Sequence, residues 1–131
     1  MNYLLDTDVL INFFKHREPE TSRIAELSGT ATLAISTLTI AELRTGWTAG
    51  QAAFFLPRLY DLCDVVPVTR EIAEQAGEWR AQYGKKGETL GTVDTVIAAT
   101  AHAQGMSLMT NNTKHYPMSE ITLFVPKTEA A

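Results

Sequence analysis

Asp6 stands at a position where a carboxylate can do chemistry. It follows directly after the apolar run Tyr3-Leu4-Leu5, which predicts a buried strand. In open α/β sheets the ligand crevice lies at the carboxyl ends of the strands, so Asp6 is a candidate ligand or catalytic residue. The alternative role is the N-cap of the following helix, which Thr7 or Asp8 would supply equally well.

Asp94 lies in the middle of the apolar stripe of a predicted helix. At about 100° per residue, the residues that share its face are apolar. They are Leu90, Ile97, Ala98 and Ala101. A buried carboxylate without a partner is costly or becomes protonated, so something must compensate its charge. A metal ion would do so, and so would a buried pair with an Arg or Lys.

Glu42 and Asn112 are weaker candidates from the residues alone. Glu42 belongs to the predicted helix TIAELRTGW and points away from its apolar side, so this pattern indicates an exposed residue. Asn112 follows a predicted strand, where a turn-forming Asn is ordinary. Lys114 and His115 in the same loop offer contacts for a phosphate, although exposed residues of this kind are usually only solvated.

Carboxylates that converge at strand ends form a hard-oxygen site, which suits Mg²⁺ or Mn²⁺. Such an ion polarises a phosphoryl oxygen and lowers the pKa of a bound water molecule, and a pair of ions steadies both the entering and the leaving oxygen. Asp6 and Asp94, with or without Glu42, therefore favour metal-dependent chemistry at phosphorus.

The elements that must position these residues alternate between strand and helix. Strands are predicted at 2–6, 32–36, 64–68, 107–110 and 121–125. Helices are predicted from Val9, from Pro19 to Gly29, through TIAELRTGW after a cap at Ser36 or Thr37, and at 49–61, 69–83 and 89–104. This order favours a single α/β domain over 1–131, with a mostly parallel five-stranded sheet whose strands are joined by right-handed crossovers.

The composition is that of a globular protein, with 45% hydrophobic and 20% charged residues. Cys63 is the only cysteine, so an internal disulfide is excluded, and we expect Cys63 to be buried. The first apolar stretch contains acidic residues and lacks a basic segment, which predicts a cytoplasmic protein without a signal peptide or membrane span. The net charge of −4 lacks the basic excess typical of nucleic-acid binders.

Four segments together resemble the PIN-domain ribonucleases, most closely the VapC-type toxins of bacterial toxin–antitoxin pairs. They are YLLDTDVLI, STLTIAELRTG, GETLGTVDTVIAATAHAQG and LMTNNTKHYP. Each segment is weak by itself, but the four have the order and spacing of the family across essentially the whole chain. The resemblance implies a PIN-like fold with three α/β/α layers and an endoribonuclease activity.

The resemblance also implies the roles of individual residues. Asp6, Glu42 and Asp94 match the acidic ligands of Mg²⁺ or Mn²⁺, and Asn112 matches a further catalytic position. Family members often have an Asp where this chain has Asn112, so the site carries one negative charge fewer, and we expect one firmly held ion rather than two. Asp8 replaces a common Asn or Ser and either joins the site or only caps the helix.

The resemblance further implies an RNA substrate, a homodimer and a cognate antitoxin whose peptide fills the active-site groove. A cation-filled acidic pocket with local basic contacts would reconcile RNA cleavage with a negative net charge. Apolar surface near four phenylalanines would suit such partners, although we expect a core role for each of them. They are Phe13, Phe14, Phe54 and Phe55.

Two other functions fit fewer residues. LLDTDVLI is similar to the D-x-D-x-[TV] signature of haloacid-dehalogenase-type phosphatases, but Leu10 takes the place of the required Thr or Val, and no acidic pair follows a later strand. A PIN-like module that only binds RNA or an antitoxin is compatible with Asn112. Metal-dependent cleavage of RNA distinguishes an enzyme from such a module.

Overall fold

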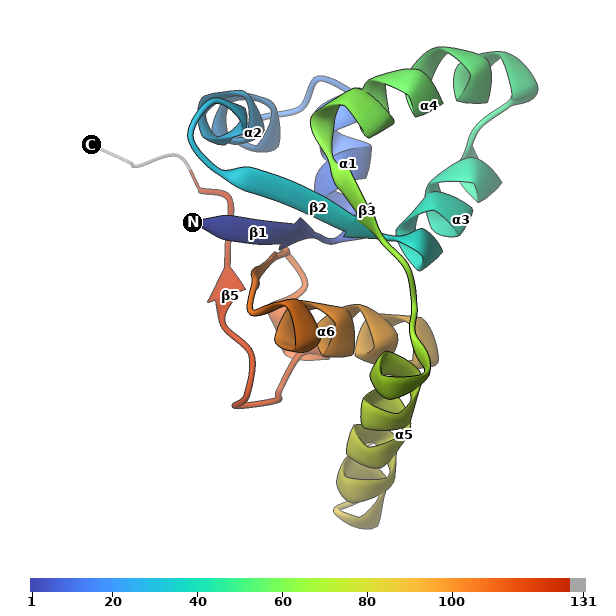
Figure 1. The fold of residues 1–131 in the computed structure, drawn as a ribbon, viewed down its shortest axis with the longest axis vertical. Helices are drawn as coiled ribbons and strands as arrows, with labels where there is room; N and C mark the ends of the chain where they lie inside the picture. Colours follow the sequence, from blue (N-terminus) through green and yellow to red (C-terminus); the bar gives the residue numbers. More distant parts are fainter. Residues whose placement is uncertain (128–131) are drawn as a thin grey trace.

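The computed structural model describes residues 1–127, which form a five-stranded parallel sheet with helices on both faces (Figure 1). The strands are β1 (Asn2–Leu5), β2 (Thr32–Ser36), β3 (Asp64–Val66), β4 (Ser107–Met109) and β5 (Leu123–Phe124). Their order is β3-β2-β1-β4-β5, and every neighbouring pair is parallel. Since β1 is central, the residue that follows it, Asp6, lies in the middle of the carboxyl edge of the sheet.

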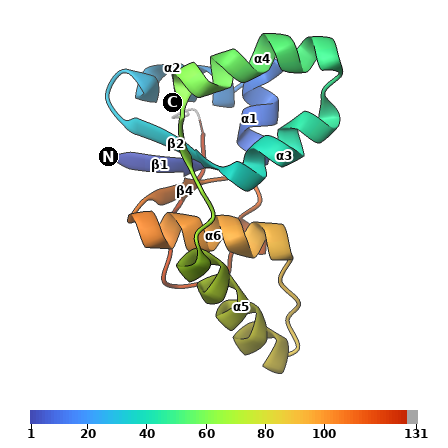
Figure 2. The same ribbon diagram turned by 45° about the vertical axis from the view of Figure 1, so that its right-hand side comes forward.

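The helices form two layers, as Figures 1 and 2 show. One layer contains α1 (Thr7–Phe14), α2 (Glu20–Ser28), α3 (Thr37–Gly46) and α4 (Ala49–Leu62). On the other face, α6 (Thr92–Gln104) covers the sheet, and α5 (Arg70–Lys85) packs mainly against α6. A short 3-10 helix, η1 (Thr113–His115), follows β4. The predicted α/β/α fold is confirmed.

The sheet separates two buried clusters of apolar side chains. Tyr3 and Leu5 of β1 belong to the cluster beneath α1–α4, whereas Leu4 belongs to the cluster with α5 and α6. Successive side chains of a strand point to opposite faces, and both faces are covered here, so β1 is apolar at consecutive positions. Cys63 is buried, as predicted.

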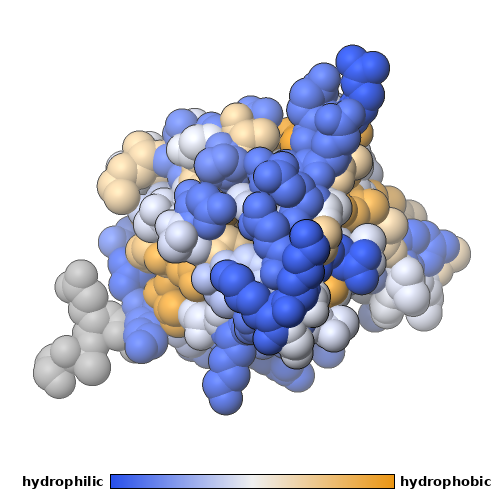
Figure 3. Space-filling view, turned by 90° about the horizontal axis from the view of Figure 1, so that it is seen from below, coloured by the Kyte–Doolittle hydropathy of each residue, from blue (hydrophilic) through white to orange (hydrophobic). Residues whose placement is uncertain are grey.

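Helix α5 shows an apolar face toward the core and a polar face toward solvent. It buries Ile72, Ala76 and Trp79, which lie on one side of the helix. Figure 3 shows the molecule from the end where α5 lies, and hydrophilic residues predominate on this surface.

Between residues 1 and 127 we find no helix with the length and apolarity that crossing a membrane requires.

Several element boundaries differ from the predictions, and helix α1 begins at Thr7 rather than at Val9. The third strand ends at Val66, because the next residue, Pro67, has no N–H for the ladder. Helix α5 continues through Gly84 to Lys85. Helix α6 begins at Thr92 rather than at residue 89, since Gly91 is its N-cap and still has extended backbone angles. The strand predicted at 121–125 is reduced to Leu123–Phe124.

Candidate active site

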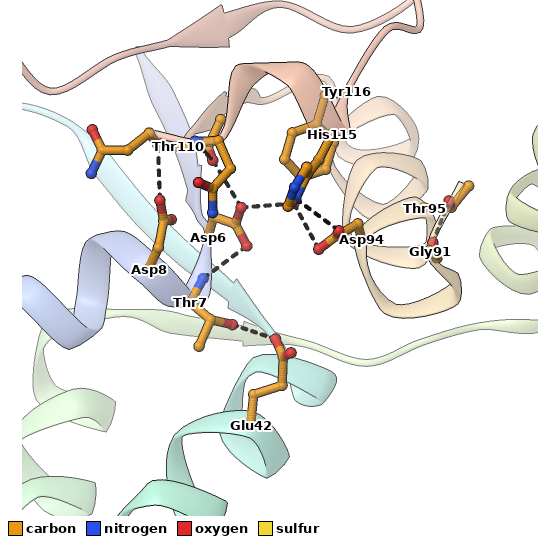
Figure 4. Close-up of polar contacts among 12 residues, drawn as sticks. Asp6, Thr7, Asp8, Glu42, Gly91, Asp94, Thr95, Thr110, His115 and Tyr116 are labelled. Carbon is orange, nitrogen blue, oxygen red and sulfur yellow. Dashed lines mark hydrogen bonds and ion pairs between the residues drawn. The ribbon is translucent and has the colours of Figure 1, made fainter. Parts of the chain in front are cut away.

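Asp6 is buried at the end of β1 and accepts three hydrogen bonds (Figure 4). Its Oδ1 accepts the N–H of Thr7 at 2.8 Å, so Asp6 has its alternative role as the N-cap of α1. Thr7 and Asp8, which were expected to supply this cap equally well, lie inside the helix. Its Oδ2 accepts the hydroxyls of Tyr116 at 2.7 Å and Thr110 at 2.9 Å. A carboxylate has about four acceptor positions. Capping and ion binding are therefore compatible roles for Asp6.

Asp94 lies in the first turn of α6 and is half-buried. Its Oδ2 lies 3.1 Å from Nδ1 of His115, and its Oδ1 lies 3.4 Å from the hydroxyl of Tyr116. Within residues 1–127, Asp94 has no Arg or Lys partner. Burial and the charge of Asp6 raise the pKa of Asp94 above its usual value, while His115 and Tyr116 act in the opposite direction.

The predicted stripe around Asp94 is buried, but Asp94 itself is not buried among it. All four apolar residues of the stripe are inaccessible or nearly so: Leu90, Ile97, Ala98 and Ala101. The late start of α6 puts Asp94 at the N-terminal end of the helix, beside the carboxyl edge of the sheet. A negative charge is favourable at this end of a helix.

Glu42 is exposed on α3, as the helical pattern predicts, and its Oε1 accepts the hydroxyl of Thr7 at 2.5 Å. Thr7 therefore joins two acids, because its N–H binds Asp6 and its hydroxyl binds Glu42. Figure 4 shows the Glu42 side chain reaching up from α3 toward this residue.

Asp8 lies beside the other acids and binds the loop after β4. Its Oδ2 accepts the backbone N–H of Asn111 at 3.0 Å. Burial is the main cause that raises its pKa from 3.8 to about 6, and the charge of Asp6 adds to the effect. The side chain of Asn111 donates to buried Glu20 at 2.6 Å, which fixes the same loop against α2.

Asn112 is exposed, and it contacts the site through its backbone. Its N–H donates to the hydroxyl of Thr110 at 3.0 Å, and within residues 1–127 its side chain makes no hydrogen bond to the acids. Three other residues of this segment contact Asp6 or Asp94: Thr110, His115 and Tyr116. These three residues were not predicted as site residues, because a loop has no periodicity. Their signals were membership of the segment LMTNNTKHYP and, for His115, a possible contact with phosphate.

Tyr116 remains a donor under ordinary conditions. Burial, together with the charge and hydrogen bond of Asp6, raises the pKa of its hydroxyl. The hydroxyl therefore keeps its proton and places it between the carboxylates of Asp6 and Asp94.

The acids are connected by hydrogen bonds that run from Glu42 through Thr7, Asp6 and Tyr116 to Asp94 (Figure 4). In the described part of the chain, no three His, Cys, Asp or Glu side chains are close enough together to hold an ion directly. Mg²⁺ usually binds one or two carboxylates and completes its shell with water and substrate phosphates. The carboxylate oxygens of Asp6 and Asp94 are suitable ligands for such a cation. Burial and the charge of Asp6 raise the pKa of Asp94, so a positive ion beside the two acids would relieve their repulsion.

Comparisons with a family model and with known proteins identify the same family. The family model described as "PIN domain" matches residues 3–120. Ribonuclease VapC10 from Mycobacterium tuberculosis is 33% identical over 117 residues, which cover 89% of this chain and 87% of that protein. The tRNA(fMet)-specific endonuclease VapC from Salmonella typhimurium is 28% identical, with coverages of 88% and 90%.

Solved structures show the same relationship. The structure of VapBC2 from Rickettsia felis bound to a DNA fragment from its promoter superposes with a TM-score of 0.84 at 26% identity, covering 95% of this chain and 98% of that one. VapBC-1 from nontypeable Haemophilus influenzae gives a TM-score of 0.82 at 25% identity, covering 96% and 98%. The chain therefore belongs to the PIN-domain family, among the VapC ribonucleases.

Proposed function

We propose that this protein is a metal-dependent endoribonuclease, the toxin of a toxin–antitoxin pair, which hydrolyses phosphodiester bonds in RNA with Mg²⁺ or Mn²⁺. One observation carries the proposal: Asp6 and Asp94 come from distant parts of the chain and meet around one tyrosine hydroxyl at the carboxyl edge of the sheet. The ribonuclease names of the relatives support the choice of RNA as substrate.

In this proposal Asp6, Asp94 and Glu42 hold the ion partly through bound water, because the three side chains are not close enough together to bind it directly. Asn112 belongs to the proposed site as a neutral group. The bound ion would polarise a phosphoryl oxygen and lower the pKa of a bound water molecule. Asp6 provides the fixed position, because three donors hold its carboxylate. Glu42 is exposed and accepts a single hydrogen bond, so its side chain has room to follow the ion or the substrate.

A phosphatase that uses Asp6 as its nucleophile fits this geometry less well. Asp6 is only 4% exposed, and its carboxylate accepts three hydrogen bonds. These hydrogen bonds make the carboxylate a poorer nucleophile, although one acceptor position on Oδ1 stays open to an ion. The second acid, Asp94, also belongs to a helix rather than to a loop after a strand.

The test of the proposed function is cleavage of total RNA by the purified protein with Mg²⁺ or Mn²⁺ and with EDTA. Asp94→Asn should abolish cleavage and leave the circular dichroism spectrum unchanged, because the oxygen that loses its charge faces the site. Asp64→Asn is the matched control, since Asp64 is exposed at the amino end of β3. Cleavage by Asp94→Asn at the wild-type rate, or undiminished cleavage in EDTA, would contradict the metal site.

We also propose that a cognate antitoxin occupies an apolar groove between α1, α2 and α4. The groove has a volume of about 730 Å³. Its lining includes four aromatic rings: Phe13, Phe14, Phe54 and Phe55. Phe54 is 52% exposed and stacks with the guanidinium of Arg58, 3.5 Å from its ring centre. Only Phe14 is buried, so the expectation of a core role holds for Phe14 and is wrong for Phe54.

A smaller hollow lies next to this groove. It has a volume of about 270 Å³, shares Phe14 and Phe55 with the groove, and is also lined by Glu42. A peptide that occupied both the groove and this hollow would reach Glu42. The VapBC names of the similar structures support this choice of partner.

Co-expression with the antitoxin tests this surface. Phe54→Asp should prevent co-purification of the complex and leave RNA cleavage by the isolated protein unchanged. Tyr60→Asp is the control, because Tyr60 is also exposed on α4 but does not line the groove. Equal loss of the complex in both variants would contradict the assignment.

We further propose that the protein forms a homodimer and is located in the cytoplasm. Sedimentation velocity would test the homodimer, and cell fractionation would test the location.

A further inference from the structure

We propose that Tyr116 is a positioning residue, whose hydroxyl holds the carboxylates of Asp6 and Asp94 in place before an ion binds. The inference rests on the proposed metal-dependent function and adds a residue that the acidic pattern does not contain. Tyr116 acts through the two acids and makes no contact of its own with the ion.

The ring of Tyr116 would fill its place in the core without the hydroxyl. The residue is 3% exposed and belongs to the same apolar cluster as Trp79 and Leu108. A phenylalanine would supply the same buried surface. The hydroxyl is thus the part of Tyr116 that packing does not require, and Figure 4 shows the side chain lying between the two aspartates.

The hydroxyl contacts both acids from this buried position. Its oxygen lies 2.7 Å from Oδ2 of Asp6 and 3.4 Å from Oδ1 of Asp94. The shorter distance assigns the hydrogen to Asp6. Two carboxylates repel one another at close range, and a donor between them limits this repulsion in the metal-free protein.

The same contact decides which oxygen of Asp6 is open. Oδ2 accepts two hydroxyls, from Thr110 and Tyr116, which occupy both of its lone pairs. Oδ1 accepts only the N–H of Thr7 and keeps one free acceptor position. Thr7 also donates its hydroxyl to Glu42. The free acceptor position of Asp6 is therefore on Oδ1, the oxygen that is linked through Thr7 to Glu42. Tyr116 and Thr110 therefore orient Asp6 toward the remaining ligands.

Removing a hydrogen-bond partner of a ligating carboxylate commonly lowers the metal affinity by tenfold to a hundredfold. We expect Tyr116→Phe to bind Mn²⁺ about tenfold more weakly than the wild-type protein, measured by titration calorimetry on the metal-free full-length chain. The Mn²⁺ concentration needed for half-maximal RNA cleavage should rise by the same factor. The rate at saturating Mn²⁺ should change much less.

Tyr83→Phe is the matched control. Its hydroxyl donates to the carbonyl of Pro117, the residue after Tyr116, at 3.2 Å and touches neither acid. This variant also loses one tyrosine hydroxyl bond to the same segment, but it should bind Mn²⁺ as the wild-type protein does. Thr110→Val should weaken Mn²⁺ binding as Tyr116→Phe does, and Thr110→Ser should restore it.

The outcomes separate the two proposals. Unchanged or tighter Mn²⁺ binding by Tyr116→Phe, in a wild-type background that binds Mn²⁺, would overturn the role of Tyr116 and leave the metal-dependent function intact. Equal weakening by Tyr83→Phe would show a structural effect only and would also overturn it. A wild-type protein that binds no Mn²⁺ and cleaves RNA in EDTA would overturn both proposals.

Discussion

Asp6 and Glu42 represent two differently built halves of the proposed site. Asp6 is buried in the centre of the sheet edge, and its donors come from the start of α1, from the end of β4 and from the segment after η1. Glu42 is exposed on α3 and accepts one hydroxyl. The position of the Asp6 carboxylate therefore depends on the packing of the core, whereas the position of the Glu42 carboxylate depends on the side chain of Thr7 alone. In the proposed site Asp6 has a structural and a functional role, whereas Glu42 has only a functional one.

The largest expected effect separates these halves directly. Asp6→Asn and Glu42→Gln should each lower RNA cleavage by at least about a hundredfold, because each removes a proposed ligand. Only Asp6→Asn should also destabilise the metal-free protein, by about 1–3 kcal/mol, since the amide nitrogen cannot accept a hydrogen bond and faces either the N–H of Thr7 or the two hydroxyls. Glu42→Gln should change the free energy of unfolding by less than about 0.5 kcal/mol.

Urea denaturation in EDTA measures both stabilities. Equal destabilisation by the two variants would contradict the division into a buried and an exposed half. A stable but inactive Asp6→Asn would show that its three hydrogen bonds contribute little to folding.

A smaller effect tests the connection between the halves. Thr7→Val keeps the N–H that binds Asp6 and the shape of the side chain, but it loses the hydroxyl that binds Glu42. Cleavage should fall about tenfold, with the free energy of unfolding unchanged. Thr7→Ser should restore the activity because it restores the hydroxyl. Wild-type cleavage by Thr7→Val would show that Glu42 finds its position without this contact.

The smallest effect concerns the pH dependence of stability in the buried half. The pKa of Asp8 is raised from 3.8 to about 6 in the folded protein. Between these pH values the folded state binds more protons than the unfolded state, so this residue makes the free energy of unfolding fall as pH rises from about 4 to about 6. Above about pH 6 this decrease in the free energy of unfolding is complete. Because Asp8 is partly exposed, we expect a loss of about 1 kcal/mol rather than the full value of the shift.

Asp8→Asn should remove this loss. In EDTA at pH 7 the variant should be more stable than the wild-type protein by about 1 kcal/mol, and the gain should disappear below pH 4. Thermal melts across this range measure the difference, with Asp64→Asn as an exposed control. A gain that does not depend on pH would exclude the charge of Asp8 as its cause.

The fold was predictable because its signals are local. A parallel strand that is buried on both faces is a continuous apolar run, as at 3–5 and 33–35, and the intervening helices have their own periodicity. The ends of the elements were less predictable. Asp6 caps α1 because its carboxylate already lies against the N–H of Thr7, and neither Asp6 nor its two neighbours is distinguished as a cap by residue type.

The candidate site was predictable in unequal parts. Asp6 could be nominated because it follows a strand, and Asp94 because its helix face is apolar. Glu42 could not be nominated from its pattern, since it is an exposed helix residue, and only the resemblance to PIN-domain ribonucleases pointed to it. Asn112 shows the reverse: the resemblance points to it, but the contacts with the acids come from Thr110, His115 and Tyr116.

The amino-acid sequence by itself determined the order of strands and helices, and with it the edge of the sheet at which Asp6 must lie. The continuous apolar runs of the strands and the periodicity of the helices are sufficient for this, because burial acts on each element separately. Only the tertiary structure decided how the acids are held. Tyr116 lies in a loop without periodicity, and its bond to Asp6 joins residues 110 positions apart. The packing of that loop against the sheet brings its hydroxyl to the acids and leaves Glu42 at the exposed rim.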